Sequence, residues 1–247
     1  MLIEIIKELK SEHPFWGYRR IWAYIRYRNN IMANKKRIYR LMKEHQLLVS
    51  QIKHLKAKRP TRPKPKASRP NEYWGIDMTK VMIPSSGWVY LVVVLDWYTK
   101  KIVGHTLRIQ SKSRDWLDAL NSAVIDQFPD GIRNHRELSL VSDNGSQPAS
   151  ESFMKGCSEL GIRQIFASYD NPKGNADTER VIRTIKEDFV WPRQWDSLFE
   201  FEESLADWVD RYNTDYPHSA IGYLTPQQFE DISKNTGCLS LTNFTAP

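Results

Sequence analysis

Cysteine, long apolar runs and, near the start of the chain, acidic side chains are all scarce in this sequence. The only cysteines are Cys157 and Cys238, and their separation fits neither a disulfide framework nor a zinc site. We expect two small, semi-buried thiols. No run of about 18 apolar residues occurs, which excludes a membrane-spanning helix. Charged residues interrupt the first part of the chain, so no secretory signal peptide is expected.

The charge is distributed very unevenly along the chain. Residues 1–70 hold 19 of the 36 Lys and Arg residues but only 4 of the 29 Asp and Glu residues. The remaining residues carry a net negative charge, although the whole chain is at +7. Positive charge concentrated at one end favours a polyanion-binding arm, and an acidic remainder suits a domain that holds divalent cations.

Residues 1–50 are predicted to form a small, basic, all-helical domain. Apolar residues recur at helical spacing, and Asn34 can cap a helix over residues 35–45. The outer face of that helix carries five cations, which are Lys35, Lys36, Arg37, Arg40 and Lys43. Two short helices around a turn, the second strongly basic, resemble a DNA-binding helix-turn-helix. The alternative is a basic, solvated helix in a small bundle.

Residues 51–70 are predicted to form an extended basic linker. Residues 53–70 contain eight Lys and Arg residues and four prolines. Proline blocks helix formation and like charges repel, so the segment stays extended. It is either a solvated spacer or a strand of positive charge that follows a phosphate backbone.

Residues 71–190 are predicted to form an α/β domain. Strand patterns cover residues 73–82, 88–95, 101–107, 138–142 and 163–167, and helical patterns cover residues 113–127, 149–160 and 175–189. Short connections predict that the first three strands pair antiparallel. The order resembles a ribonuclease-H-like mixed five-stranded sheet with flanking helices. Residues 191–247 are predicted to form a helical tail.

Three carboxylates stand out as candidate metal ligands. Asp77 lies within the first strand, on the face opposite Trp74 and Ile76, where a carboxylate is costly unless it is paired or metal-bound. Asp143 ends the fourth strand, and Glu179 lies near the start of the helix that Asn175 can cap. Each has an ordinary alternative: a salt-bridged strand aspartate, a turn aspartate before Asn-Gly, and an exposed Glu179–Arg183 pair.

The combination of these residues resembles the DDE transposases, specifically bacterial insertion-sequence transposases with an integrase-like core. Between Asp143 and Glu179 lie 35 residues, the spacing that names the DD-35-E group. Further matching segments are Trp74–Thr79, Val94–Asp96, Ile102–Gly104, Ser142–Ser146, Lys173–Asp177, Tyr212–Asn213, Pro217–His218 and Leu224–Pro226. At the N-terminal end, Gly17–Ile21 and Lys36–Lys43 match the basic helical domain of the same group.

The resemblance implies that Asp77, Asp143 and Glu179 bind two Mg²⁺ or Mn²⁺ ions and carry out DNA cleavage and strand transfer at the ends of a mobile element. It implies that Arg183 and Lys186 contact DNA phosphates. The expected partners are double-stranded DNA, both terminal inverted repeats and target, further copies of the chain, and a possible upstream-frame product. The expected location is the bacterial cytoplasm, at the nucleoid.

Two residues depart from the group, and several nearby acids are set aside. Tyr216 stands where the group often has Arg, and Trp16 replaces a more usual Tyr. The group keeps Asp96 without using it for metal, and helical geometry points Asp177 away from Glu179. The remaining acids are predicted to be surface groups, namely Asp126, Asp170 and Asp188.

Two rival functions use parts of the same sequence. A ribonuclease-H-like nuclease would use the same carboxylates to cut DNA without joining it. A DNA-binding repressor would use the basic arm and no metal. The intact carboxylate triad weighs against the repressor, and the basic N-terminal domain favours joining over simple cutting.

Overall fold

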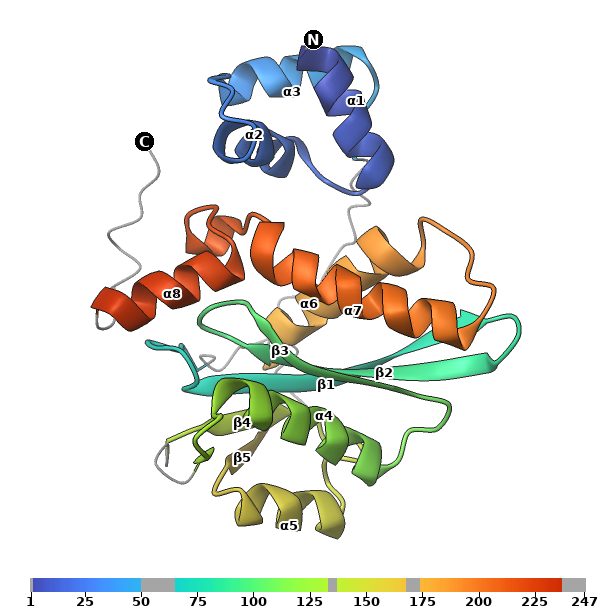
Figure 1. Ribbon diagram of the computed structural model, residues 1–247, viewed down its shortest axis with the longest axis vertical. Coiled ribbons are helices and arrows are strands. Elements are labelled where there is room, and N and C mark those ends of the chain that lie inside the picture. Colours follow the sequence, from blue (N-terminus) through green and yellow to red (C-terminus); the bar gives the residue numbers. More distant parts are fainter. Residues whose placement is uncertain (1, 50–64, 133–136, 168–173, 237–247) are drawn as a thin grey trace, which may run out of the picture.

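The computed structural model describes residues 2–49, 65–132, 137–167 and 174–236 (Figure 1). Most of the linker predicted over residues 51–70, together with Asp170 and Cys238, lies outside these residues, and Cys157 is a buried free thiol. No helix in the described ranges is long and apolar enough to cross a bilayer.

Three helices form the N-terminal module, as predicted. They are α1 (Leu2–Glu12), α2 (Tyr18–Tyr27) and α3 (Lys35–Glu44). Asn34 caps α3, because its side-chain oxygen accepts a hydrogen bond from the backbone N–H of Lys36 at 2.8 Å. The apolar faces of the three helices pack on one another through Ile6, Ile21 and Ile38, all fully buried.

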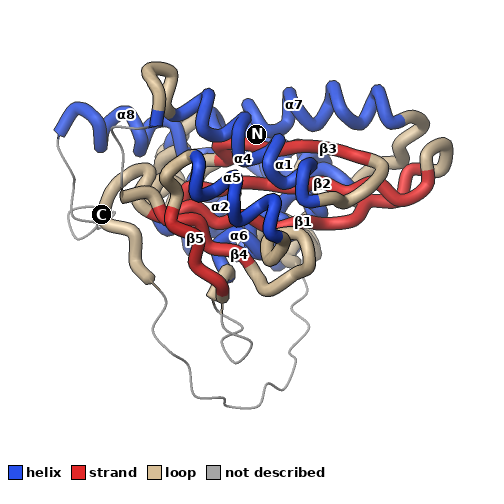
Figure 2. Tube along the Cα trace, turned by 90° about the horizontal axis from the view of Figure 1, so that it is seen from below, coloured by secondary structure: helices blue, strands red, loops and turns tan. Residues whose placement is uncertain are grey.

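A mixed sheet of five strands forms the centre of the protein, and the predicted fold class is confirmed. The strands are β1 (Tyr73–Ile83), β2 (Gly87–Asp96), β3 (Ile102–Arg108), β4 (Ser139–Ser142) and β5 (Arg163–Phe166). Their order is β3-β2-β1-β4-β5. The first three pair antiparallel, as the short connections predict, whereas β4 and β5 pair parallel. In Figure 2 the three long strands lie side by side.

Helices cover both faces of this sheet. On one face lie α4 (Ser113–Gln127) and α5 (Glu151–Glu159), and on the other α6 (Ala176–Ile185) and α7 (Leu198–Asp215), followed by α8 (Pro226–Thr236) (Figure 1). Strand alternation separates the two cores: Trp74 and Ile76 pack toward α4, while Val93 and Leu95 pack toward α6 and α7. Asp77 therefore lies on the face opposite Trp74 and Ile76, as predicted, and α6 covers that face.

The helix predicted over residues 175–189 is confirmed with a change in geometry. Its α-helical part ends at Ile185, and Lys186–Val190 continue as one π-helical turn. Such turns insert an extra residue and occur frequently at functional sites. Here the turn buries Asp188, Phe189 and Val190 against α7 and the N-terminal module.

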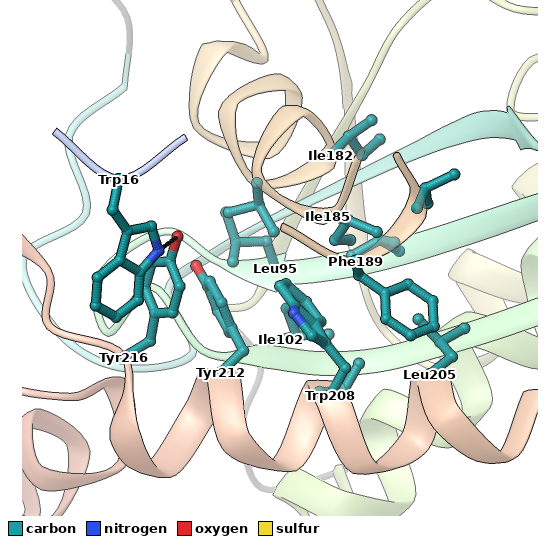
Figure 3. Packing of buried hydrophobic residues seen from close by; sticks show 14 of the residues in the cluster. Trp16, Leu95, Ile102, Ile182, Ile185, Phe189, Leu205, Trp208, Tyr212 and Tyr216 are labelled. Carbon is teal, nitrogen blue, oxygen red and sulfur yellow. Dashed lines mark hydrogen bonds between the residues drawn. The ribbon is translucent and has the colours of Figure 1, made fainter. Parts of the chain in front are cut away.

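The N-terminal module packs on the C-terminal helices through an aromatic contact. Trp16, just before α2, lies against Tyr216 at the end of α7, with ring centroids 5.0 Å apart (Figure 3). Tyr24 of α2 donates a hydrogen bond to Asp215 at 3.0 Å, and Arg28 forms an ion pair with the same carboxylate at 3.2 Å. The module is thus part of the same hydrophobic core as α6 and α7.

Candidate functional site

The parallel pairing of β1 with β4 brings two of the three predicted acids level with each other. Gly75 of β1 is in register with Val141 of β4. Two residues further along the chain stand Asp77, within β1, and Asp143, the first residue after β4. Residues level on paired strands point to the same face, and a step of two keeps that face. Strand alternation therefore directs Asp77 toward α6, and the pairing brings the turn that holds Asp143 to the same end of the two strands.

The start of α6 rests directly on β1, beside Asp77. The side chain of Asn175 donates a hydrogen bond to the carbonyl of Ile76 at 3.1 Å, and Thr178 accepts one from the Trp97 indole at 3.2 Å. A Cβ atom on Gly75 would lie 1.9 Å from the Thr178 hydroxyl. Only glycine at position 75 permits this approach, which places Glu179 over the strand that carries Asp77.

Asn175 holds the helix in a different way from the one predicted. It occupies the N-cap position of α6, but its side chain makes no capping hydrogen bond. The side-chain Nδ2 of Asn175 instead donates to the backbone of β1. Its Oδ1 is buried with no hydrogen-bond partner among the described residues. The prediction of a side-chain cap was therefore wrong, because contact with the sheet outweighs local capping.

Asp77 lies in the field of the two other acids. It is half-buried, and its Oδ1 accepts a hydrogen bond from the backbone N–H of Met78 at 2.8 Å. The pKa of Asp77 is raised to about 6: burial contributes most and the negative charges of Asp143 and Glu179 add to the rise, while the N–H donor of Met78 and the charge of Lys186 oppose it. Asp77 thus interacts electrostatically with two further carboxylates and one lysine.

The side chains of Asp143 and Glu179 are exposed to solvent. Asp143 accepts a hydrogen bond from the backbone N–H of Gly145 at 3.0 Å, which is the turn chemistry expected of Asp before Asn-Gly. Asn144 fastens the turn by donating to the carbonyl of Ala167 at 2.7 Å. The turn interaction leaves the second oxygen of Asp143 available.

Glu179 does not form the pair with Arg183 that was its ordinary alternative. Arg183 instead pairs with Glu187, one helical turn further on, at 2.9 Å. Within the described residues, no cation lies within ion-pairing distance of Glu179 or Asp77. Ordinary surface pairing therefore accounts for neither carboxylate.

The three carboxylates are the kind of ligand that a hard divalent cation such as Mg²⁺ prefers, although their oxygens do not surround a single ion-binding position. Carboxylate oxygens are the ligands that Mg²⁺ prefers, and three from separate elements suffice because Mg²⁺ keeps some of its waters. In the described parts of the chain, no group of three or more His, Cys, Asp or Glu side chains is gathered closely enough to hold an ion. Mutual repulsion of like charges favours this spread arrangement.

The acids set aside from the sequence have mostly structural surroundings. Asp96 is buried and accepts hydrogen bonds from the Thr99 hydroxyl at 2.8 Å and the Tyr98 N–H at 3.1 Å. Asp177 pairs with Lys100 at 3.3 Å. Asp126 is exposed, as predicted. These contacts account for their charges without a metal.

Asp188 corrects the sequence prediction of a surface group. It is 9% exposed and accepts hydrogen bonds from the Trp16 indole at 2.8 Å and from the Tyr216 hydroxyl. Its position three residues after the buried Ile185 is a helical-spacing signal that could have revealed its burial. Both departures from the group, Trp16 and Tyr216, thus meet at one carboxylate. Tyr216 is buried in this contact.

The predicted DNA-contacting cations have different surroundings. On α3, four of the five are exposed, namely Lys36, Arg37, Arg40 and Lys43. Lys35 is half-buried, and its Nζ lies 4.2 Å from the centroid of the Trp22 ring. Near the acids, Arg183 is exposed but paired with Glu187, while Lys186 is half-buried within the field of Asp77.

Comparison with known protein families agrees with this architecture. Two families described as Integrase core domain match residues 67–172 and 160–226, and together they cover more than half of the chain. A family described as HTH-like domain matches residues 1–54.

Individual proteins show the same similarity. The transposase for insertion sequence element IS904 of Lactococcus lactis is 28% identical over 245 residues, which are 93% of each chain. An uncharacterised 39.2 kDa protein of insertion element IS476 from Xanthomonas euvesicatoria is 28% identical over 226 residues, 90% of this chain but only 62% of that protein. This chain therefore spans less than two thirds of the Xanthomonas relative.

A solved structure shares the fold. A chain in the simian T-cell lymphotropic virus intasome, in complex with PP2A regulatory subunit B56 gamma, matches with a TM-score of 0.54 at 15% identity. The match covers 97% of this chain and 78% of that one. At this identity the likeness concerns the fold alone. The family matches show that this chain contains an integrase core domain preceded by an HTH-like domain, and over most of its length it is similar to an insertion-sequence transposase.

Proposed function

We propose that this chain cuts DNA strands and joins DNA ends in a divalent-metal-dependent reaction that uses Asp77, Asp143 and Glu179. The observation that supports the proposal is that Asp77 on β1 lies within the electrostatic influence of Asp143, just after β4, and of Glu179 on α6, whose charges raise its pKa. Folding places like charges together only at a cost, so their proximity needs a compensating positive ligand. Mg²⁺ or Mn²⁺, as two ions, suits this oxygen-only set.

Each residue has a distinct part in the reaction. Bound divalent ions would supply charge stabilisation at the attacking and leaving oxygens of the phosphodiester. Asp77 from β1, Asp143 from the turn after β4 and Glu179 from α6 would hold the ions. The hydrogen bonds from Met78 and Gly145 orient the first two carboxylates before any ligand binds.

DNA binding is proposed for two surfaces. The exposed cations of α3, which are Lys36, Arg37, Arg40 and Lys43, would contact DNA in the manner of a helix-turn-helix, with Lys35 beside them. Arg183 and Lys186 flank the acids and would hold the scissile strand by its phosphates. The terminal inverted repeats, the target DNA, further copies of the chain and an upstream-frame product remain the proposed partners. The division of the chain into domains at residues 1–50, 51–70, 71–190 and 191–247 is likewise a proposal.

The test is a strand-cleavage and strand-transfer assay on labelled DNA carrying the ends of the element. We expect Mg²⁺-dependent cleavage and transfer by the unmodified chain, and loss of both in Asp143→Asn with DNA binding retained. Asp126→Asn, which removes an exposed acid from α4, serves as the matched control and should keep full activity.

The rival functions give different results in the same assay. Cleavage without any joined product would identify a nuclease of the same fold. DNA binding without Mg²⁺-dependent nicking would identify a repressor. Unchanged cleavage in Asp143→Asn would remove the catalytic assignment altogether.

A further inference from the structure

A cavity opens between α2 and α3 in the N-terminal module. It has a volume of about 490 Å³, within the range of roughly 300–1,000 Å³ found for small-molecule sites. Three aromatic rings and three cations line most of it, namely Tyr18, Trp22, Tyr39, Arg26, Lys35 and Lys36. Asn34, the N-cap of α3, completes the wall at the start of that helix.

The charged groups of this cavity are all positive and unneutralised. No Asp or Glu lines the cavity, and no carboxylate in the described part of the chain lies within ion-pairing distance of Arg26, Lys35 or Lys36. Surface cations elsewhere do find acids, as Arg28 does with Asp215. Three like charges at one concave place attract an anion.

The aromatic rings that line the cavity offer flat surfaces on which a planar ligand can stack. Lys35 lies over the Trp22 ring at 4.2 Å, and Arg26 lies 5.8 Å from it, so one ring already holds two cations. Tyr18 and Tyr39 meet edge to face with centroids 5.0 Å apart, and Tyr39 is exposed at the rim. Tyr39 is 42% exposed, so part of its ring is open to solvent and available for a planar group to stack on.

A ligand that matches both features is anionic and planar, which describes a nucleotide. Phosphates of a paired duplex are reached by cations on a convex surface and need no cavity. The faces of a paired base are covered by its neighbours, so a base that enters an aromatic cavity must be unpaired. The size of the cavity and its aromatic lining therefore favour an unpaired nucleotide over a duplex phosphate.

We propose that the cavity between α2 and α3 binds one unpaired nucleotide of DNA, with its phosphate against Arg26, Lys35 and Lys36 and its base on Tyr39. This proposal rests on the proposed DNA-binding function. The nucleotide would lie at the start of α3, beside the exposed cations that contact the duplex. The module would then distinguish DNA with an unpaired strand from fully paired DNA.

The test compares two labelled probes by fluorescence anisotropy with the full chain: a fully paired duplex and the same duplex with a single-stranded oligothymidine tail. We expect the unmodified chain to bind the tailed probe more tightly. Tyr39→Ala should weaken tailed-probe binding on the order of tenfold, the size of one lost stacking contact, and leave the paired probe unchanged. Lys36→Gln, at an exposed position that tolerates change, should weaken the tailed probe more than the paired one.

The matched control is Arg40→Gln, which removes an exposed cation of α3 outside the cavity. It should weaken both probes in the same ratio. Equal affinity of the unmodified chain for both probes, or equal losses in Tyr39→Ala, would overturn the proposal. So would displacement of the tailed probe by polyglutamate as readily as by oligothymidine. A failure here leaves Mg²⁺-dependent cleavage intact, whereas failure of the proposed function abolishes cleavage whatever the probe preference.

Discussion

Asp77 and Asp188 are both carboxylates that folding removes from water, yet their surroundings are opposite. Burial raises the pKa of Asp188, but the hydrogen bonds that it accepts from Tyr216 and Trp16 and the charges of Arg20 and Lys10 all oppose this rise. Asp77 has one backbone donor, and its nearest charged neighbours include two further acids. A compensated buried acid stabilises the fold, whereas an uncompensated one costs stability and points to a ligand.

The largest expected difference between the two acids is in activity. Asp77→Asn should lower the DNA cleavage rate by about three orders of magnitude, because metal-held charge stabilisation is worth several kcal/mol. The free energy of unfolding should stay the same or rise, since a like charge disappears and an amide oxygen can still accept from Met78. Cleavage kinetics and urea unfolding measure both. A loss of stability with retained cleavage would reverse the assignment.

Asp188→Ala should have the opposite profile, with a loss of stability as its primary effect. It removes the acceptor of the Tyr216 hydroxyl and one of the two acceptors of the Trp16 N–H, which also donates to the Tyr216 oxygen at 2.9 Å. Two hydrogen bonds to a charged group are lost, at about 1.5–3 kcal/mol each. We expect the free energy of unfolding to fall by about 2–4 kcal/mol in urea denaturation. Asp126→Ala, at an exposed site, should change it by less than about 0.5 kcal/mol. A similar small change in Asp188→Ala would show that the buried contact is not stabilising.

Asp96 extends the comparison to pH. Burial raises its pKa to about 6 from 3.8, although Thr99 and Tyr98 oppose the rise by hydrogen bonding. The folded state then binds more protons than the unfolded state between these values, so stability falls as the pH rises from about 4 to about 6. The difference in unfolding free energy between the chain and Asp96→Asn should change by on the order of 2–3 kcal/mol across this window. A difference that is constant with pH would contradict the shift.

Gly75→Ala tests how the sheet positions Glu179. The new methyl would meet the Thr178 hydroxyl, so α6 must move away from β1, at a cost of about 1–2 kcal/mol. Cleavage should fall as well, since Glu179 moves with the helix. Gly17→Ala, where nothing lies within 4 Å of the added methyl, is the matched control and should alter cleavage little. Full cleavage by Gly75→Ala would show that the contact of α6 with β1 does not position Glu179.

Much of the fold could be predicted because its signals are local. Alternation and helical spacing identify the five strands and the helices α1 to α6 from neighbouring residues, and the side chain of Asn34 caps α3 by accepting from the N–H two positions away. The short connections also predict antiparallel pairing of the first three strands. These features depend on interactions between residues close in sequence, so their pattern is present before any tertiary contact forms.

The features that sequence reasoning missed depend on distant partners. Asp188 is buried by Trp16, 172 residues away, and Trp16 is joined to Tyr216, 200 residues away. Asn175 gives up its capping role for the carbonyl of Ile76, 99 residues away. No local pattern records which side chains meet across such separations.

For the candidate site, too, some features follow from the sequence and others only from tertiary packing. The identities of Asp77, Asp143 and Glu179, their spacing and the placement of Asp77 on one strand face follow from residue order and the two-residue period of a strand. Their mutual electrostatic influence follows from packing. The parallel pairing of β1 with β4 brings Asp143, just after β4, toward Asp77, and the absence of a side chain at Gly75 lets α6 lie close to β1 with Glu179. A charge acts through space, so its effect on another group is set by where the chain places both.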